Sequence, residues 1–224
     1  MPILTKEQWI RKQRKKRFTI KIILFLLLLI PLFLIGSTLL SHLRIFPPNK
    51  IVNITTLDGI SVDEMFLTPN SYSRPQTPLY EVKNIVVHYT GNPGTTGIAN
   101  RNYFENLMTK KTTSASSHYV IGLDGEIIQC LPLNEISYAT NHRNNDTISI
   151  ETCHPDVTGK FNDKTYKSLV ALVANLVKEY NLEINDVIRH YDVTEKKCPL
   201  YYVDHPDEWD AFKDDVSSYI KNNF

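Results

Sequence analysis

A long apolar segment near the N-terminus constrains this chain more than any other feature. No Asp, Glu, Lys or Arg occurs from Ile22 to Leu43. The hydrocarbon core of a bilayer is roughly 30 Å thick, and about 20 apolar residues in a helix span it. We therefore predict one transmembrane helix over residues 18–43, and the rest of the chain has to fold outside the bilayer.

The charges on either side of this segment predict its orientation. Residues 1–17 are rich in Lys and Arg, whereas Arg44 and Lys50 are the next basic residues after it. The positive-inside rule makes residues 1–17 a basic cytoplasmic tail and puts the remainder outside the cell. A cleaved signal peptide is the alternative, but the apolar run is long and no Ala-x-Ala site follows. These features favour an uncleaved, single-pass signal anchor in the cell membrane.

The remaining chain divides into a linker and one domain. Residues 44–70 contain two adjacent prolines and a mixed polar stretch, which is typical of a linker. Residues 71–224 are long enough for one domain with its own core. The formal net charge is +1, and because residues 1–21 are strongly basic, the rest of the chain is net negative. Nucleic-acid binding is therefore not expected.

The hydrophobic periodicity predicts alternating strands and helices. Strands are expected at residues 85–88, 118–121, 126–130, 148–153 and 187–190, and helices at residues 98–108, 163–180 and 206–220. Asp124-Gly125 predicts a hairpin turn between the second and third strands. Together these elements predict an α/β fold with a single mixed β-sheet flanked by helices.

Two predicted strands end in histidine, and a cysteine follows the second. His88 ends one apolar run, His190 ends another, and Cys198 comes eight residues later. Two imidazoles and a thiolate suit zinc, and three protein ligands leave a position for water, as in catalytic sites. Taken singly, each residue has an ordinary alternative: a strand histidine packs in a core, and a lone cysteine is a small buried apolar residue.

Glu151 is a candidate catalytic acid on the strand at 148–153. Alternation puts it on the face opposite Ile148 and Ile150. The His-Glu-x-x-His motif of common metalloproteases is absent. The adjacent pair Cys153-His154 does not indicate a cysteine hydrolase, because such nucleophile pairs are normally distant in sequence.

Four segments resemble one known family in their order along the chain. They lie at residues 85–90, 116–121, 147–151 and 189–199. From about residue 71 to the C-terminus the chain resembles zinc-dependent N-acetylmuramoyl-L-alanine amidases, which include phage endolysins and are similar to peptidoglycan recognition proteins. The sequence departs from the family pattern at Ser149, where Gly is frequent, and at Ser117, where one branch has a catalytic Tyr.

The resemblance implies a role for each candidate. Zn²⁺ would be held by His88, His190 and Cys198, with Glu151 as the catalytic carboxylate and Lys196 facing the reacting carbonyl. Since Ser117 replaces the Tyr of one branch, acid-base chemistry should fall on Glu151. Zinc ligation would also explain the odd cysteine count, leaving Cys130 and Cys153 as buried thiols, which we favour, or as a disulfide.

The implied activity is hydrolysis of peptidoglycan. Zinc-activated water would cleave the amide between the lactyl group of N-acetylmuramic acid and L-alanine of the stem peptide. The alternatives are a catalytically weak or inactive, membrane-anchored peptidoglycan-binding module, and a regulator in which the anchor matters more than the site. No oligomeric state is predicted.

Substrate contacts are predicted from the loops that flank the candidate site. Asn141 and Arg143 lie in a polar loop before the Glu151 strand, and His118 opens a strand of its own. We expect Arg143 to pair with a stem-peptide carboxylate, because a guanidinium binds a carboxylate through two parallel hydrogen bonds. The loop at residues 91–94 is expected to border the same cleft.

Overall fold

The computed structural model describes residues 49–50, 52–57 and 59–224, with residues 11, 15, 19, 21, 25 and 27. The chain divides into two compact units, residues 1–47 and 48–224. Apart from those isolated positions, the predicted tail at 1–17 and anchor at 18–43 lie outside the described residues. Within the described residues, no helix is long and apolar enough to cross a bilayer.

In the described part of the second unit, seven strands form one mixed sheet in the order β1-β2-β5-β4-β6-β3-β7. The strands are β1 (Thr56–Leu57), β2 (Ile60–Glu64), β3 (Asn84–Tyr89), β4 (Tyr119–Ile121), β5 (Ile127–Gln129), β6 (Thr147–Thr152) and β7 (Val187–Arg189). Strands β4, β6, β3 and β7 run parallel, whereas β4 and β5 form an antiparallel hairpin. Gly125 turns this hairpin with φ +84°, a conformation that glycine adopts without steric cost.

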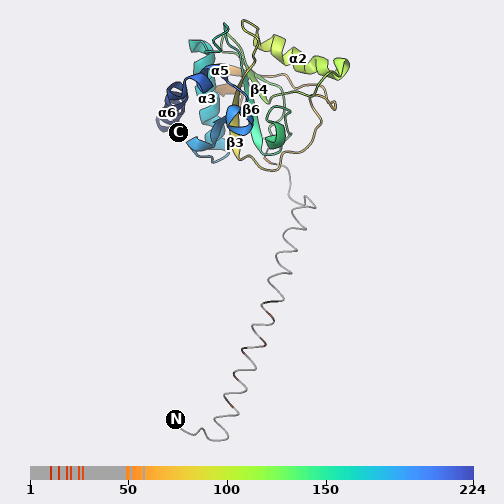
Figure 1. The fold of residues 1–224 in the computed structure, drawn as a ribbon, viewed down its shortest axis with the longest axis vertical. Helices are drawn as coiled ribbons and strands as arrows, with labels where there is room; N and C mark the ends of the chain where they lie inside the picture. The colour runs from red at the N-terminus through yellow and green to blue at the C-terminus, as the bar shows by residue number, and fades with distance from the viewer. Residues whose placement is uncertain are drawn as a thin grey trace. The chain divides into compact units, whose positions relative to one another are not determined.

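Helices cover both faces of the sheet (Figure 1). The α-helices are α2 (Gly97–Lys110), α3 (Asp163–Glu179), α4 (Tyr191–Thr194), α5 (Leu200–Asp204) and α6 (Pro206–Asn223), with 3₁₀ turns η1 (Asn141–Arg143) and η2 (Ile184–Asp186). Helices α3 and α6 pack together on one face, and α2 lies over the other. The predicted mixed sheet flanked by helices is confirmed.

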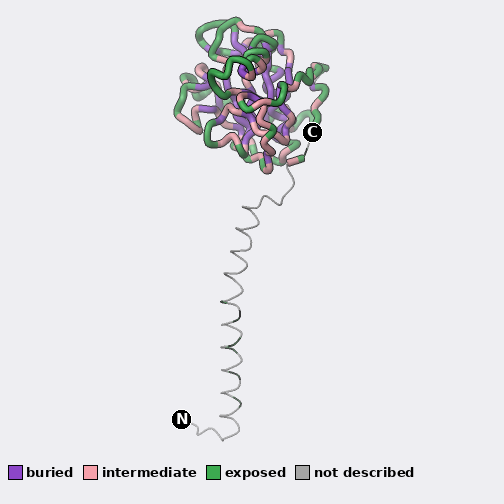
Figure 2. Tube along the Cα trace, turned by 90° about the vertical axis from the view of Figure 1, so that its right-hand side faces the viewer, coloured by how far each residue is buried: buried purple, intermediate pink, exposed green. Residues whose placement is uncertain are grey.

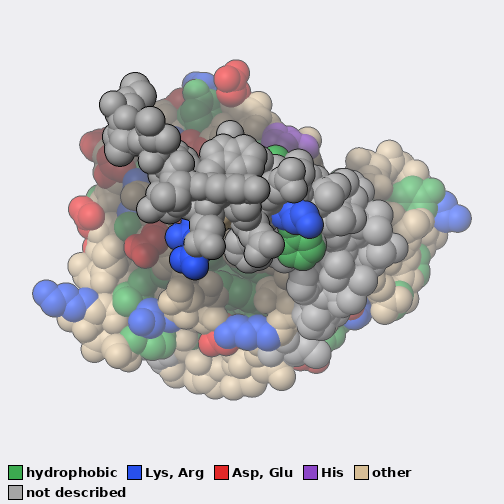
Figure 3. All heavy atoms as spheres, turned by 90° about the horizontal axis from the view of Figure 1, so that it is seen from below, with side chains coloured by type: hydrophobic (Ala, Val, Ile, Leu, Met, Phe, Trp, Pro, Cys, Tyr) green, Lys and Arg blue, Asp and Glu red, His purple; other side chains and the backbone are tan. Residues whose placement is uncertain are grey.

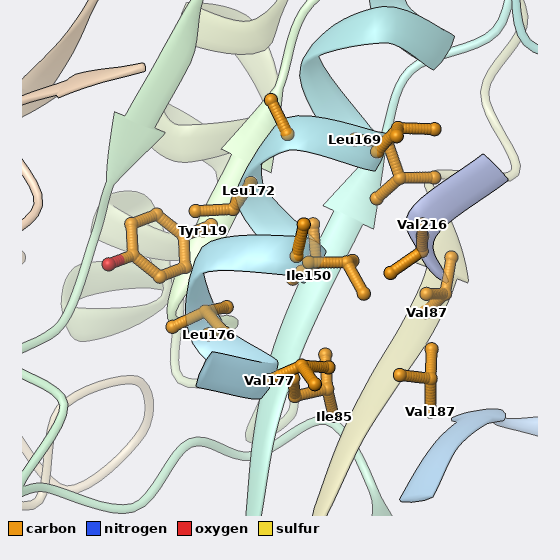
Figure 4. Packing of buried hydrophobic residues seen from close by; sticks show 14 of the residues in the cluster. Ile85, Val87, Tyr119, Ile150, Leu169, Leu172, Leu176, Val177, Val187 and Val216 are labelled. Carbon is orange, nitrogen blue, oxygen red and sulfur yellow. The ribbon is translucent and has the colours of Figure 1, made fainter. Parts of the chain in front are cut away.

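The main core lies between the sheet and α3. Ile85 and Val87 of β3 and Ile150 of β6 contact the apolar side of α3 (Figure 4). Burying each such side chain contributes about 1.5 to 3 kcal/mol to the stability of the folded state. Figure 2 shows that the buried residues are concentrated inside this unit. Because side chains alternate along a strand, His88 and Glu151 point to the other face, away from α3.

A smaller apolar cluster lies beneath α2 on that second face. It contains Phe104 of α2, Val120 and Ile128 of the sheet, and the thiols of Cys130 and Cys153. Both cysteines are free and buried, which confirms the favoured prediction. The surface is mixed in charge: Lys and Arg side chains lie among Asp and Glu side chains on the face in Figure 3.

The predicted linker at residues 44–70 is corrected by the structure. Strands β1 and β2 fall inside it, and Val52, Leu57 and Leu67 are buried. The folded unit therefore begins near residue 48 instead of 71. Ile60 and Val62 of β2 alternate with polar residues, which is the signal of a short strand, although it extends over only a few residues.

Candidate active site

Strand register brings the two histidines together. Strands β3 and β7 are parallel, and the His190 N–H donates to the Val87 carbonyl, so both imidazoles lie near the carboxyl ends of neighbouring strands. Their ring centroids are 4.7 Å apart. After His190 the chain turns through α4, reverses at Glu195 in the left-handed conformation, and returns to Cys198.

These three side chains form a compact and buried donor set. The Cys198 Sγ lies 3.8 Å from His88 Nδ1, and the ligand atoms of all three residues lie within 4.8 Å of one another. Nitrogen and sulfur ligands at about 2.1 and 2.3 Å from a tetrahedral zinc are about 3.6 Å apart. The separation of His88 and Cys198 therefore fits two ligands of one ion.

The protonation states of the three groups also fit zinc. Burial holds the pKa of His88 well below its ordinary value and lowers the pKa of His190 to about 4, with the Lys196 charge acting in the same direction. Both imidazoles are neutral at neutral pH and carry a free lone pair. Burial raises the pKa of the Cys198 thiol to about 12, so a bound cation has to displace its proton.

Glu151 lies directly beside His88. The two residues are paired across the parallel strands β3 and β6. Burial raises the pKa of Glu151 to about 8, an effect that the Lys196 charge opposes, and Oε2 has no hydrogen-bond partner among the described residues. A cavity of about 140 Å³ opens next to this carboxylate, and it is lined by Thr90, Asn92, Asn100, Tyr103, Phe104, Ala115 and Glu151. Asn92 belongs to the loop that was expected to border the cleft.

Lys196 and Lys197 differ in their surroundings. Lys196 is exposed, and its positive charge lowers the pKa values of His88, His190, Glu151 and Cys198, so its ammonium group lies within electrostatic range of all four. The ammonium group of Lys197 instead pairs with Asp204 at 2.7 Å. The structure therefore separates two adjacent lysines that the sequence distinguishes only through the family resemblance.

Arg143, which was predicted to contact substrate, makes hydrogen bonds within the protein. Its guanidinium donates to Asp146 at 2.8 Å and to Asn84 Oδ1 at 2.6 Å. Asn84 is the first residue of β3, four residues before His88. The guanidinium of Arg143 therefore binds at the end of β3 that is opposite to His88. Its role in the structure is to fix the loop before β6.

His118, the third predicted substrate contact, is fully buried, so its side chain has no exposed surface in this structure and its contacts are structural. Its Nδ1 accepts the backbone N–H of Ser149, and its Nε2 donates to the Glu135 carbonyl at 2.9 Å. The hydroxyl of Ser149 bonds Ser137 at 2.7 Å and lies 3.2 Å from the Ser117 hydroxyl. This network explains how Ser149 fits at a position where the family often has Gly.

The burial of His118 predicts acid destabilisation. Burial lowers the pKa of His118 to about 4, against about 6.5 in the unfolded chain. The unfolded state therefore takes up the proton first as the pH falls, and stability is lost between about pH 6.5 and pH 4. Below about pH 4 this group lowers the free energy of unfolding by roughly 3 kcal/mol relative to its value above pH 6.5. Urea unfolding at several pH values should show a weaker pH dependence for His118→Gln than for the parent; identical dependence would contradict this assignment.

Asn141 lies next to the site, and the contact that it makes there is with His190, one of the candidate zinc-binding residues. Its Oδ1 is 2.9 Å from His190 Nε2. The sequence suggested a substrate contact because the loop is polar. The contact with His190 was missed, because it depends on the left-handed backbone of Asn141, where φ is 54°.

A mixed sheet with two histidines, a cysteine and a glutamate at one place defines a candidate metal-dependent hydrolase. The family model described as N-acetylmuramoyl-L-alanine amidase matches residues 78–200. The chain is 32% identical over 176 residues to the N-acetylmuramoyl-L-alanine amidase CwlL of Bacillus licheniformis, covering 73% of this chain and 48% of that relative. The chain belongs to the N-acetylmuramoyl-L-alanine amidase family.

Solved structures support the same assignment. A mutant endolysin from Bacillus subtilis is similar with a TM-score of 0.60 and 29% identity, covering 70% of this chain and 99% of that one. The catalytic domain of XlyA, an amidase of Bacillus subtilis, is similar with a TM-score of 0.58 and 27% identity, covering 70% of this chain and 99% of that one. By contrast, the chain spans about half the length of the curated relatives it matches.

Proposed function

We propose that this chain is a zinc-dependent N-acetylmuramoyl-L-alanine amidase that cleaves peptidoglycan. The observation that carries the proposal is the cluster of His88, His190 and Cys198, with Glu151 paired beside His88 and a cavity next to Glu151. The relative CwlL is named for this activity. The bond cleaved is the amide between the lactyl group of N-acetylmuramic acid and L-alanine of the stem peptide.

His88, His190 and Cys198 would hold the zinc, which supplies a Lewis acid that polarises a carbonyl and lowers the pKa of water. Glu151 acts as general base and then as general acid. It takes a proton from the attacking water as the water oxygen bonds to the carbonyl carbon, and it gives this proton to the amine nitrogen as the C–N bond breaks. A base must be ionised. Burial raises the pKa of Glu151 to about 8, the Lys196 charge opposes that rise, and a bound zinc cation would favour the ionised carboxylate further. The products are a lactyl carboxylate and a stem peptide with a free L-alanine amine.

Lys196 stabilises the negative charge that develops on the carbonyl oxygen. Its positive charge already acts on Glu151 and His190 in the folded chain, which supports a role that requires little reorganisation. Removing one such preorganised donor commonly costs about 2.7 to 4 kcal/mol of transition-state stabilisation.

The variant Lys196→Met should therefore lower kcat by about 10²- to 10³-fold and leave zinc affinity nearly unchanged. Lys197→Met is the matched control, because this neighbouring lysine pairs with Asp204 on the surface. Steady-state kinetics on a soluble muropeptide would measure the effect. A higher KM with an unchanged kcat would assign Lys196 to substrate binding instead.

The proposed activity can be tested with the purified full-length chain and defined muropeptides. Mass spectrometry should detect intact stem peptide with a free L-alanine amine, and a chelator should abolish its release. Adding zinc back should restore activity. Tight binding without cleavage at full zinc occupancy would contradict the amidase proposal and would leave a peptidoglycan-binding module.

We also propose that residues 18–43 anchor the enzyme in the cell membrane, with residues 1–17 in the cytoplasm and the amidase unit facing the cell wall. Support comes from the charge-free apolar run and from the basic flank that precedes it. Fractionation of cells should recover the chain with the membrane. External protease should degrade the amidase unit in intact spheroplasts; protection of that unit would contradict this orientation.

A further inference from the structure

We infer that Asn141 is a positioning residue that fixes His190 in the tautomer able to bind a metal. This inference rests on the proposed zinc site and concerns a residue that does not itself touch the ion. Asn141 Oδ1 lies 2.9 Å from His190 Nε2. An amide oxygen only accepts hydrogen bonds, so the ring nitrogen that faces it must carry the proton.

The proton on Nε2 decides which nitrogen is available. In a neutral imidazole, a protonated Nε2 leaves the lone pair on Nδ1. Because Nε2 donates its hydrogen to Asn141, Nδ1 is the nitrogen of His190 whose lone pair is available to bind a metal together with His88 and Cys198. Metal-bound histidines usually donate their other ring N–H to an oxygen acceptor, which fixes ring orientation and tautomer.

The loop around Asn141 holds the side chain in this position. Asn141 has a left-handed backbone with φ 54°, a conformation that asparagine tolerates better than most residues. The Asn144 Oδ1 accepts the backbone N–H groups of Ala139 and Thr140 at 3.2 and 2.6 Å. Arg143 ties the loop to Asp146 and Asn84. A residue other than glycine keeps a left-handed backbone conformation only where the contacts around it stabilise that conformation.

Two substitutions separate the hydrogen bond from the backbone conformation. Asn141→Gly removes the acceptor and adopts the left-handed conformation freely. Asn141→Asp keeps an oxygen acceptor at the same place. Asn145→Gly is the matched control, because Asn145 is an exposed asparagine in the same loop. Circular dichroism of each full-length variant would establish that it is folded.

Zinc affinity is the first readout, measured by competition with a chromophoric chelator. Asn141→Gly should raise the dissociation constant about 10- to 100-fold, whereas Asn141→Asp and Asn145→Gly should stay near the parent value. Unchanged affinity in folded Asn141→Gly would overturn the inference. Failure of the parent to bind zinc at all would instead overturn the proposed function.

The tautomer of His190 is the second readout, and it needs no metal. Nitrogen NMR of zinc-free full-length protein labelled on histidine, with His190→Gln for assignment, should show His190 protonated on Nε2 in the parent and in Asn141→Asp. Asn141→Gly should show both tautomers. A parent protein with the proton on His190 Nδ1 would overturn the inference whether or not the chain is an active amidase.

Discussion

Replacing Glu151 with Gln is expected to reduce kcat by about 10²- to 10⁴-fold while zinc remains bound. The substitution keeps the size of the side chain and removes its ability to take a proton. Glu151 is half-buried beside His88 and is not one of the three candidate ligands, so the metal site should survive. Steady-state kinetics and zinc content measured on the same preparation would separate the two effects.

Glu81→Gln provides the matched control for this experiment. Glu81 is an exposed carboxylate whose contact with the exposed Lys83 contributes little to stability. The Glu81→Gln variant should have the same kcat, zinc content and thermal stability as the parent protein. If Glu151→Gln lost its zinc, or kept its full rate, the assignment of Glu151 as the proton carrier would be wrong.

Replacing Cys198 with Ala should abolish both zinc binding and turnover. The loss removes the thiolate from the three-donor set and leaves two imidazoles, which bind zinc far more weakly. Ligand binding to the folded state stabilises it by about 2.7 kcal/mol at a free zinc concentration of 100 times Kd. For the parent this corresponds to a rise in Tm of roughly 5 to 10 °C on adding zinc. Cys198→Ala should show no such rise in differential scanning calorimetry.

The buried thiol of Cys130 supplies the comparison for that result. Cys130 lies in the apolar cluster beneath α2 and is not part of the donor set. Cys130→Ala should lower Tm by loss of packing and yet keep the zinc-dependent rise. A zinc-dependent rise that persists in Cys198→Ala would mean that the ion is held elsewhere.

The sheet and the donor set could be predicted because the local signals were strong. His88 and His190 end short apolar runs, and parallel strands bring their carboxyl ends to the same edge. The stripe of apolar residues on α3 likewise predicted the helix and the face that it buries. Strands β1 and β2 were missed because they have only two and five residues and are partly exposed, so their patterns are weak.

The roles of the polar residues around the site could not be read from the sequence. His118 was predicted to contact substrate because it opens a strand, and Asn141 and Arg143 because they lie in a polar loop. Their partners are instead a carbonyl at Glu135, the ring of His190, and a carboxylate at Asp146. These contacts depend on loop conformation and on residues distant in sequence, which periodicity does not report.

The pairing of His88 with Glu151 across β3 and β6 ties the candidate site to the register of two core strands. A shift of β6 by one residue along β3 would place Ser149 and Glu151 on the α3 side and Ile150 against the donor set. Such a shift would cost the core the fully buried side chains of Ile148 and Ile150 and would separate Glu151 from His88 at the same time. The packing that stabilises the domain therefore also selects the strand pairing on which the candidate chemistry depends.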